Sequence, residues 1–179
     1  MLAFEDPVHQ SQTVFRQLLD AMAHPGRIVE LSVTPALEAV ALALFDADVS
    51  VWTPDDEPRR GWLRERCGCR LSEEMREASF ALLPAGAPVP PLDRFACGTP
   101  AEPESSATVI VGVRALRGGT RVTLRGPGID GEVVVSPAVP PSFWKSWREN
   151  ARRSPLGVDA LLVSDTAVLA LPRTAQVAE

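Results

Sequence analysis

The sequence is poor in lysine, histidine and tyrosine, three residue types that carry much of the chemistry of protein sites. Among its 179 residues it has one lysine, Lys145, two histidines and no tyrosine, so arginine supplies almost all of the positive charge. The formal net charge is -5. Binding to nucleic-acid phosphates needs clustered Lys and Arg, so we expect no nucleic-acid partner.

The sequence also lacks the segments that direct a chain to or through a membrane. It has no run of about 18 apolar residues, so we expect no membrane span. The first residues, Met1 to Asp6, have neither the basic region nor the long apolar run of a secretory leader. The three cysteines, Cys67, Cys69 and Cys97, are odd in number and follow no disulfide-framework spacing. These features favour a reducing cytoplasm.

Several catalytic motifs are absent. The sequence has no G-x-x-x-x-G-K-[ST] loop, which excludes a Walker-type nucleotide site. It has no G-x-S-x-G elbow, and the histidines have no evident serine or cysteine partner for triad chemistry. Cys67-Gly68-Cys69 lacks the second pair that a structural zinc site needs, so we expect no metal. The residues alone therefore give no complete catalytic set.

The length and the composition predict one folded domain over residues 1–179. An apolar fraction of 45% and a charged fraction of 23% are ordinary for a globular protein. Cap-plus-proline signals begin two expected helices, at Asp6-Pro7 and at Thr34-Pro35, and the first ends at His24-Pro25-Gly26. Further helices are expected at residues 61–66 and from Pro141 or Ser142 onward.

Apolar runs bounded by turn residues predict the strands. The expected strands cover residues 28–33, 49–52, 108–113, 120–124, 133–135, 161–163 and 168–171, and residues 78–83 are a buried strand or a helix end. The Gly118-Gly119 turn predicts a hairpin between 108–113 and 120–124, and Ser164-Asp165 predicts a closing hairpin. Helices followed by strands with one late helix indicate an α/β or α+β sheet domain.

One loop is a candidate anion site. Gly126-Pro127-Gly128 has the glycine content of turns that present backbone N–H groups to an anion, and Arg121 and Arg125 flank it. The alternative is that the glycines and the proline only make a tight turn between strands. Near the other end of the chain, His24 closes a helix, where an imidazole interacts favourably with the helix dipole. A capping role is the simpler interpretation of His24.

The late helix carries the remaining candidates. Trp144 and Trp147 are i, i+3 neighbours and lie either in the core or at an interface. The arginine-rich stretch that follows, residues 148–153, is an interface candidate because arginine and aromatic residues are enriched at binding hot spots. Lys145 is either a solvated helix residue or a Schiff-base lysine.

Four blocks in order along the chain resemble the PhnH family of carbon–phosphorus lyase subunits. They match the family patterns F-R-x-x-L-x-A-M-A-x-P-G, G-T…P-E-x-x-A-T, L-x-G-P-G-I and N…P-L-G-V-D…P-R-T. The poorest match lies between Trp52 and Leu83, and Glu102 stands where the family often has an aromatic residue. The blocks are Phe15–Gly26, Gly98–Thr108, Leu124–Ile129, and Asn150 with Pro155–Asp159 and Leu171–Thr174.

The resemblance implies a mixed β-sheet flanked by helices, similar to the fold of pyridoxal-phosphate (PLP)-dependent transferases but without the cofactor or its lysine. It implies a homodimer in isolation and a complex with the G, I and J subunits. That complex degrades alkylphosphonates: it forms alpha-D-ribose 1-methylphosphonate 5-triphosphate from ATP and alkylphosphonate, and a radical step then cleaves the C–P bond. The resemblance also implies that the iron–sulfur chemistry belongs to the J subunit, which fits the composition, since three scattered cysteines cannot hold a cluster.

Two functions follow as hypotheses. In the first, the chain is a subunit that acts mainly through assembly of the complex. Its interface candidates are Trp144, Trp147, Arg148 and Arg152.

In the second, it is a stand-alone phosphate- or nucleotide-binding enzyme. There Arg125, Gly126, Gly128 and Arg173 hold phosphate, with His24 or Asp159 as proton-transfer groups. A third possibility, a PLP enzyme, would use Lys145.

Overall fold

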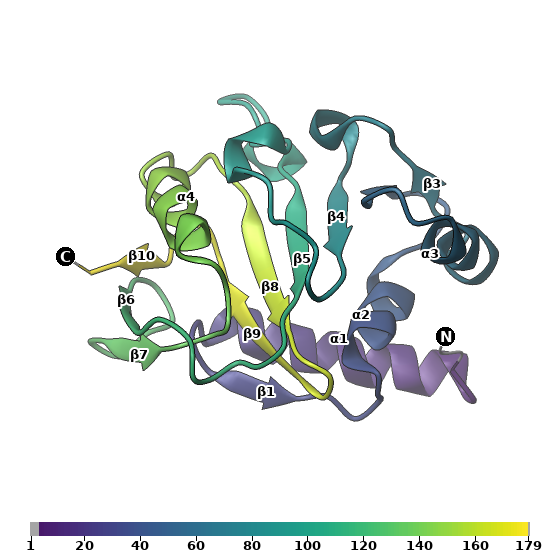
Figure 1. The fold of residues 1–179 in the computed structure, drawn as a ribbon, viewed down its shortest axis with the longest axis horizontal. Helices are drawn as coiled ribbons and strands as arrows, with labels where there is room; N and C mark the ends of the chain where they lie inside the picture. Colours follow the sequence, from purple (N-terminus) through teal and green to yellow (C-terminus); the bar gives the residue numbers. More distant parts are fainter. Residues whose placement is uncertain (1–3, 179) are drawn as a thin grey trace.

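The chain folds around a seven-stranded mixed β-sheet with a second, three-stranded sheet beside it (Figure 1). The computed structural model describes residues 4–178. Met1–Ala3, the start of the stretch in which we expected no secretory leader, and Glu179 lie outside the described residues. The large sheet has the strand order β1-β9-β8-β5-β4-β2-β3, and the small sheet has the order β10-β6-β7.

The strands of the two sheets are short, two to five residues each. The large sheet contains β1 (Ile28–Glu30), β2 (Ser50–Trp52), β3 (Arg70–Leu71), β4 (Phe80–Leu83), β5 (Thr108–Gly112), β8 (Asp159–Val163) and β9 (Ala167–Leu171). The small sheet contains β6 (Val122–Arg125), β7 (Val133–Val135) and β10 (Gln176–Val177). The helices are α1 (Pro7–Ala23), α2 (Ala36–Leu44), α3 (Glu57–Trp62) and α4 (Pro141–Ala151), with short helical turns at Leu63–Cys67, Met75–Glu77, Leu92–Arg94 and Pro103–Ser105.

The large sheet separates two hydrophobic cores. Strands β2, β3, β4, β5 and β8 run parallel, β9 runs antiparallel to β8, and β1 pairs antiparallel with β9 at the edge. Because side chains alternate along a strand, Val109 and Val111 of β5 enter the core shared with α4 and the small sheet. Ile110 enters the opposite core, which is shared with α1 and α2. The expected class, a mixed β-sheet flanked by helices, is confirmed.

Local sequence signals predicted the ends of the chain well. The first helix is confirmed: the Asp6 carboxylate accepts a hydrogen bond from the backbone N–H of His9 at 3.2 Å, and His24 is the C-cap. The closing hairpin is confirmed by antiparallel pairing of β8 with β9. The late helix begins at Pro141, and residues 80–83 form a strand.

The hairpin expected between residues 108–113 and 120–124 is wrong. β5 lies between β4 and β8 and is parallel to both, whereas β6 pairs with β7 and β10 in the small sheet. The physical reason is burial. Residues 109–112 are all buried, so this run needs cover on both faces, as a central parallel strand has. The alternating burial of β6 suits a sheet with one solvated face.

Two further boundaries differ from expectation. The second helix begins at Ala36, and Pro35 is its N-cap without a side-chain hydrogen bond, so Thr34 is not the cap. Pro35 keeps an extended backbone, with ψ near 136°, and the helix can begin only after it. The expected 61–66 helix is present as the end of α3 and the π-helical turn that follows it.

Among residues 4–178, no helix combines the length and the apolar character that a membrane crossing requires.

Candidate functional site

The glycine loop after β6 packs tightly against two other segments. Gly126 has φ near +141°, and a Cβ there would lie 2.7 Å from the carbonyl oxygen of Thr174. Gly128 has φ near +81°, and a Cβ there would overlap the carbonyl oxygen of Ala23. Both glycines are therefore explained by backbone conformation and close packing. These contacts favour the turn interpretation of the loop over the phosphate-cradle interpretation.

His24 lies beside this loop, but its ring is already engaged. Its Nδ1 lies 3.0 Å from the carbonyl oxygen of Asp20 and 3.1 Å from a carboxylate oxygen of the same residue. Asp20 also contacts Arg27 at 3.5 Å. The imidazole therefore closes the last turn of α1, as the capping interpretation predicts.

Arg173 is tied into the protein rather than directed at an open site. Its Nε and Nη2 donate to the two carboxylate oxygens of Asp159 at 3.2 and 2.6 Å. Its Nη1 donates to the carbonyl oxygens of Pro103 at 2.9 Å and Pro155 at 3.4 Å. The side chains of the pair are only 17% and 16% exposed. The guanidinium joins the start of β8 to two loops and to the C-terminal segment.

The two tryptophans of α4 belong to the domain's own core. Trp144 is 2% exposed and Trp147 is fully buried, and the Nε1 of Trp147 donates to the carbonyl oxygen of Ala175 at 2.9 Å. The ring of Phe143 stacks on that of Trp147, with centroids 6.1 Å apart. This is the core alternative, so neither indole presents a surface to a partner in this structure. Lys145 of the same helix is exposed.

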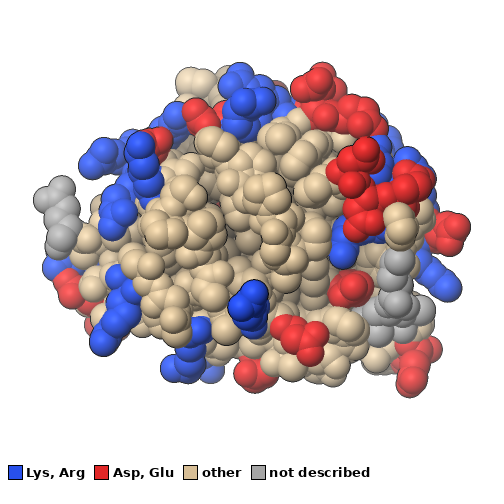
Figure 2. Space-filling model, in the orientation of Figure 1, with Lys and Arg blue, Asp and Glu red and all other residues tan. Residues whose placement is uncertain are grey.

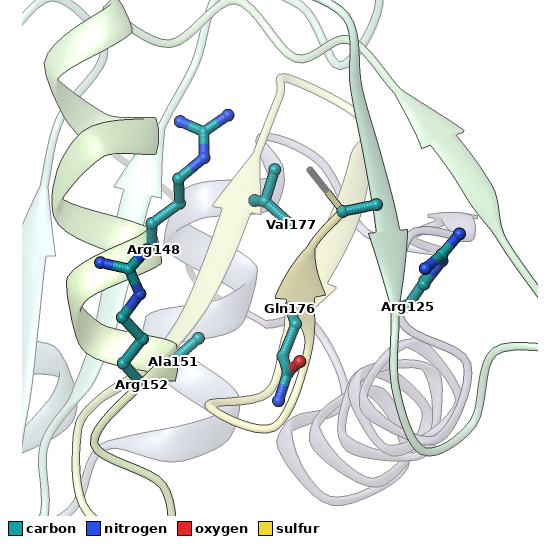
Figure 3. Close-up of a pocket in the computed structure, with 7 residues that line it drawn as sticks. Arg125, Arg148, Ala151, Arg152, Gln176 and Val177 are labelled. Carbon is teal, nitrogen blue, oxygen red and sulfur yellow. The ribbon is translucent and has the colours of Figure 1, made fainter.

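Arg148 and Arg152 lie one turn apart on the exposed side of α4 and line a hollow of about 420 Å³. We name this hollow the α4–β10 groove. It lies between the end of α4 and the small sheet, and Figure 3 shows both arginines running along the helix, with Gln176 and Val177 opposite them. Among residues 4–178, the groove is lined by Arg125, Arg148, Ala151, Arg152, Gln176, Val177 and Ala178, none of which is acidic.

Arg125 contributes less to this groove than its place in the lining suggests. Its guanidinium forms an ion pair with Glu132, and Figure 3 shows it on the far side of β10 from the other two arginines. The structure thus brings together Arg148 and Arg152, which the sequence singled out as interface residues. It separates them from His24 and Arg173.

Neither a metal cluster nor the Cys67 thiol provides an alternative centre of chemistry among the described residues. Within 4–178, no group of three or more His, Cys, Asp or Glu side chains is placed to hold a metal ion. Burial, together with the neighbouring Cys69 thiol, raises the pKa of Cys67 to about 12. A thiol with so high a pKa is almost fully protonated at neutral pH and is a poor nucleophile.

Comparison with known proteins places the chain in a family. The family model described as "Bacterial phosphonate metabolism protein (PhnH)" matches residues 2–178. The chain belongs to the PhnH family. It is 39% identical, over 96% of its own length and 92% of the relative's, to "Alpha-D-ribose 1-methylphosphonate 5-triphosphate synthase subunit PhnH" of Rhizobium meliloti (strain 1021). It is 35% identical, over 94% and 86%, to "Putative C-P lyase subunit protein HtxG" of Stutzerimonas stutzeri.

Within this PhnH-family chain, the last of the resemblance blocks has a structural explanation. Asn150 is 3% exposed on α4, and its amide group bonds both backbone groups of Val158: Nδ2 donates to the carbonyl at 2.9 Å, and Oδ1 accepts from the N–H at 2.8 Å. Gly157, with φ near +111°, lets the chain pass close to that amide. The sequence analysis missed this role of Asn150. The signal was a polar residue on the apolar face of α4, three positions after Trp147.

Proposed function

We propose that this chain is the H subunit of a carbon–phosphorus lyase complex in phosphonate catabolism. In this role it is needed to form alpha-D-ribose 1-methylphosphonate 5-triphosphate from ATP and alkylphosphonate. One observation carries the proposal: nearly the whole chain matches the PhnH family, including a relative named as a subunit of that synthase. The second relative, named as a putative C-P lyase subunit, supports the same role.

The chain acts in this proposal mainly through assembly of the complex. Support comes from how its candidate catalytic groups are used. The ring of His24 caps α1, the guanidinium of Arg173 is paired with Asp159, and the Cys67 thiol is held protonated by burial. Lys145, the lysine that a PLP Schiff base would need, is an exposed residue on the outside of α4.

The partners in this proposal are the G, I and J subunits, and the isolated chain is a cytoplasmic homodimer of one-domain protomers. Its fold is related in shape to that of PLP-dependent transferases but works without the cofactor. The mixed sheet with helices on both faces supports this relation, and the apolar residues of the two cores support a single folded unit.

Co-expression tests the proposal directly. The tagged chain is produced with its G, I and J counterparts from the same genome, purified through the tag and separated by size-exclusion chromatography. We expect one large species that contains all four chains. If the chain elutes alone at low salt and high concentration, the assembly role is wrong.

A further inference from the structure

Arg148 of α4 and Arg152, the C-cap of that helix, have no carboxylate partner among the described residues, whereas seven other arginines have one. Ion pairs within 4.0 Å engage Arg27, Arg59, Arg60, Arg64, Arg125, Arg153 and Arg173. Within the described part of the chain, no such pair involves Arg148 or Arg152. The guanidinium of Arg148 has one weak contact, 3.5 Å from Nη1 to the carbonyl oxygen of Trp144. Two positive charges are therefore left uncompensated on one side of a protein whose net charge is -5.

The surface view shows how this side differs from the rest of the molecule. In Figure 2, basic side chains gather at the left, over the region of α4 and the small sheet, and most acidic side chains lie at the right. A local excess of positive charge raises the concentration of anions near it. The α4–β10 groove opens within this basic region, and none of the described residues that line it is acidic. An anionic ligand fits this charge distribution.

The opposite wall of the groove adds a backbone donor. β10 is the last strand of the small sheet and pairs only with β6. The N–H of Ala178 donates to the carbonyl oxygen of Thr123 at 2.8 Å, which fixes the register of the pair. In an antiparallel ladder the hydrogen-bonding side alternates, so the N–H and C=O of Val177 point away from β6. They point toward α4, on the same side as the Ala175 carbonyl that accepts from Trp147.

We propose that the α4–β10 groove binds a phosphate-type oxyanion, the phosphate, phosphonate or polyphosphate group of a small molecule. Arg148 and Arg152 supply guanidinium donors whose planar geometry matches the oxygens of such a group. The N–H of Val177 supplies a third donor, as exposed backbone amides do in anion sites. The volume of about 420 Å³ lies within the range of small-molecule sites, about 300–1,000 Å³.

A small anion fits this groove better than an extended acidic segment of a partner protein. Strand addition depends on a row of outward-facing backbone groups. β10 has two residues, and only Val177 turns its backbone groups outward. One residue gives too few hydrogen bonds to hold an added strand, whereas one N–H beside two guanidiniums suffices for a phosphate group. The site goes beyond the proposed function, which needs only assembly from this chain.

Isothermal titration of the full chain with inorganic tripolyphosphate at low salt tests the site. The groove variant is Arg148→Gln/Arg152→Gln. The matched control is Arg16→Gln/Arg66→Gln, which removes the same charge from two exposed arginines outside the groove. We expect saturable binding with one site per chain, weakened at least about tenfold in the groove variant and less than about twofold in the control. Circular dichroism verifies that both variants are folded.

Two results would contradict the anion site. The site does not exist if the wild-type chain shows no saturable binding, or if both double variants lose affinity equally. Co-expression with the G, I and J counterparts separates this question from the proposed function. If the groove variant keeps its affinity for tripolyphosphate but no longer co-elutes with the partners, the groove docks protein and the proposal is overturned. If the groove variant loses tripolyphosphate affinity and still co-elutes, the anion site and the assembly role are both supported.

Discussion

Replacing Arg173 by methionine removes a charged group that four oxygen atoms hold in place. The guanidinium donates to both carboxylate oxygens of Asp159 and to the carbonyl oxygens of Pro103 and Pro155. Removing one partner of a buried ion pair costs about 3–5 kcal/mol, because the other charge stays buried without compensation. Both side chains retain about one sixth of their exposure, which lowers that cost by solvent screening. We therefore expect Arg173→Met to lower the free energy of unfolding by about 2–4 kcal/mol.

Urea denaturation, followed by the fluorescence of the buried tryptophans, measures this loss. A double-mutant cycle with Asp159→Asn isolates the pair itself. The double variant is expected to lose less than the sum of the two single variants, by about 1–2 kcal/mol. Arg66→Met, at an exposed arginine without an ion pair, is the control and should change the free energy by less than about 0.5 kcal/mol. A loss below about 1 kcal/mol for Arg173→Met, or strict additivity, would refute the structural role and restore Arg173 as a ligand-binding candidate.

Three further changes test separate contacts. Asn150→Ala leaves the buried N–H and C=O of Val158 without partners and should cost about 2–4 kcal/mol in urea denaturation; a loss below about 1 kcal/mol contradicts this. Gly128→Ala should lower the melting temperature more than Gly131→Ala. Both glycines have positive φ, but only at Gly128 would an added Cβ collide with backbone atoms; equal shifts would show that the backbone conformation alone determines the loss of stability. Since burial raises the pKa of Cys67 to about 12, this thiol should react with iodoacetamide at pH 8 at least about tenfold more slowly in the native chain than in urea. Mass spectrometry of the peptide that contains Cys67 measures both rates. Equal rates would contradict that burial.

The sequence predicted the elements whose signals are local. Asp6-Pro7 and His24-Pro25-Gly26 mark both ends of α1, because a cap, a proline and a glycine act within one helical turn. The Ser164-Asp165 turn joins two apolar runs that pair with each other. By contrast, the same reasoning paired β5 with the wrong strand, although the continuous apolar run Val109-Ile110-Val111 was itself a signal for a central parallel strand. Strand pairing is decided by segments distant in sequence, so local turn chemistry cannot fix it.

The candidate site was foreseen in part. Arg148 and Arg152 were chosen for their residue type and their place on α4, and they line the groove. The choice between core and interface for Trp144 and Trp147 depends on what covers that face of the helix, and no spacing rule contains this information. Gln176 and Val177 were not foreseen at all. Their role as a groove wall depends on the register of a two-residue strand with β6.

The pairing of β1 with β9 joins the two ends of the polypeptide. Ile28 lies opposite Leu169, and the N–H of Gly26 donates to the carbonyl oxygen of Ala170 at 3.3 Å. During translation, α1 and β1 leave the ribosome before the other described elements, and β9, the strand that β1 pairs with, follows only after strands β2 to β8. The apolar stripe of α1, which includes Val14 and Leu18, can pack early against α2, but the part of its core that β9 supplies, including Val168 and Ala170, is missing until β9 has been synthesised. The β1 edge of the large sheet is therefore expected to close late in the folding of this chain.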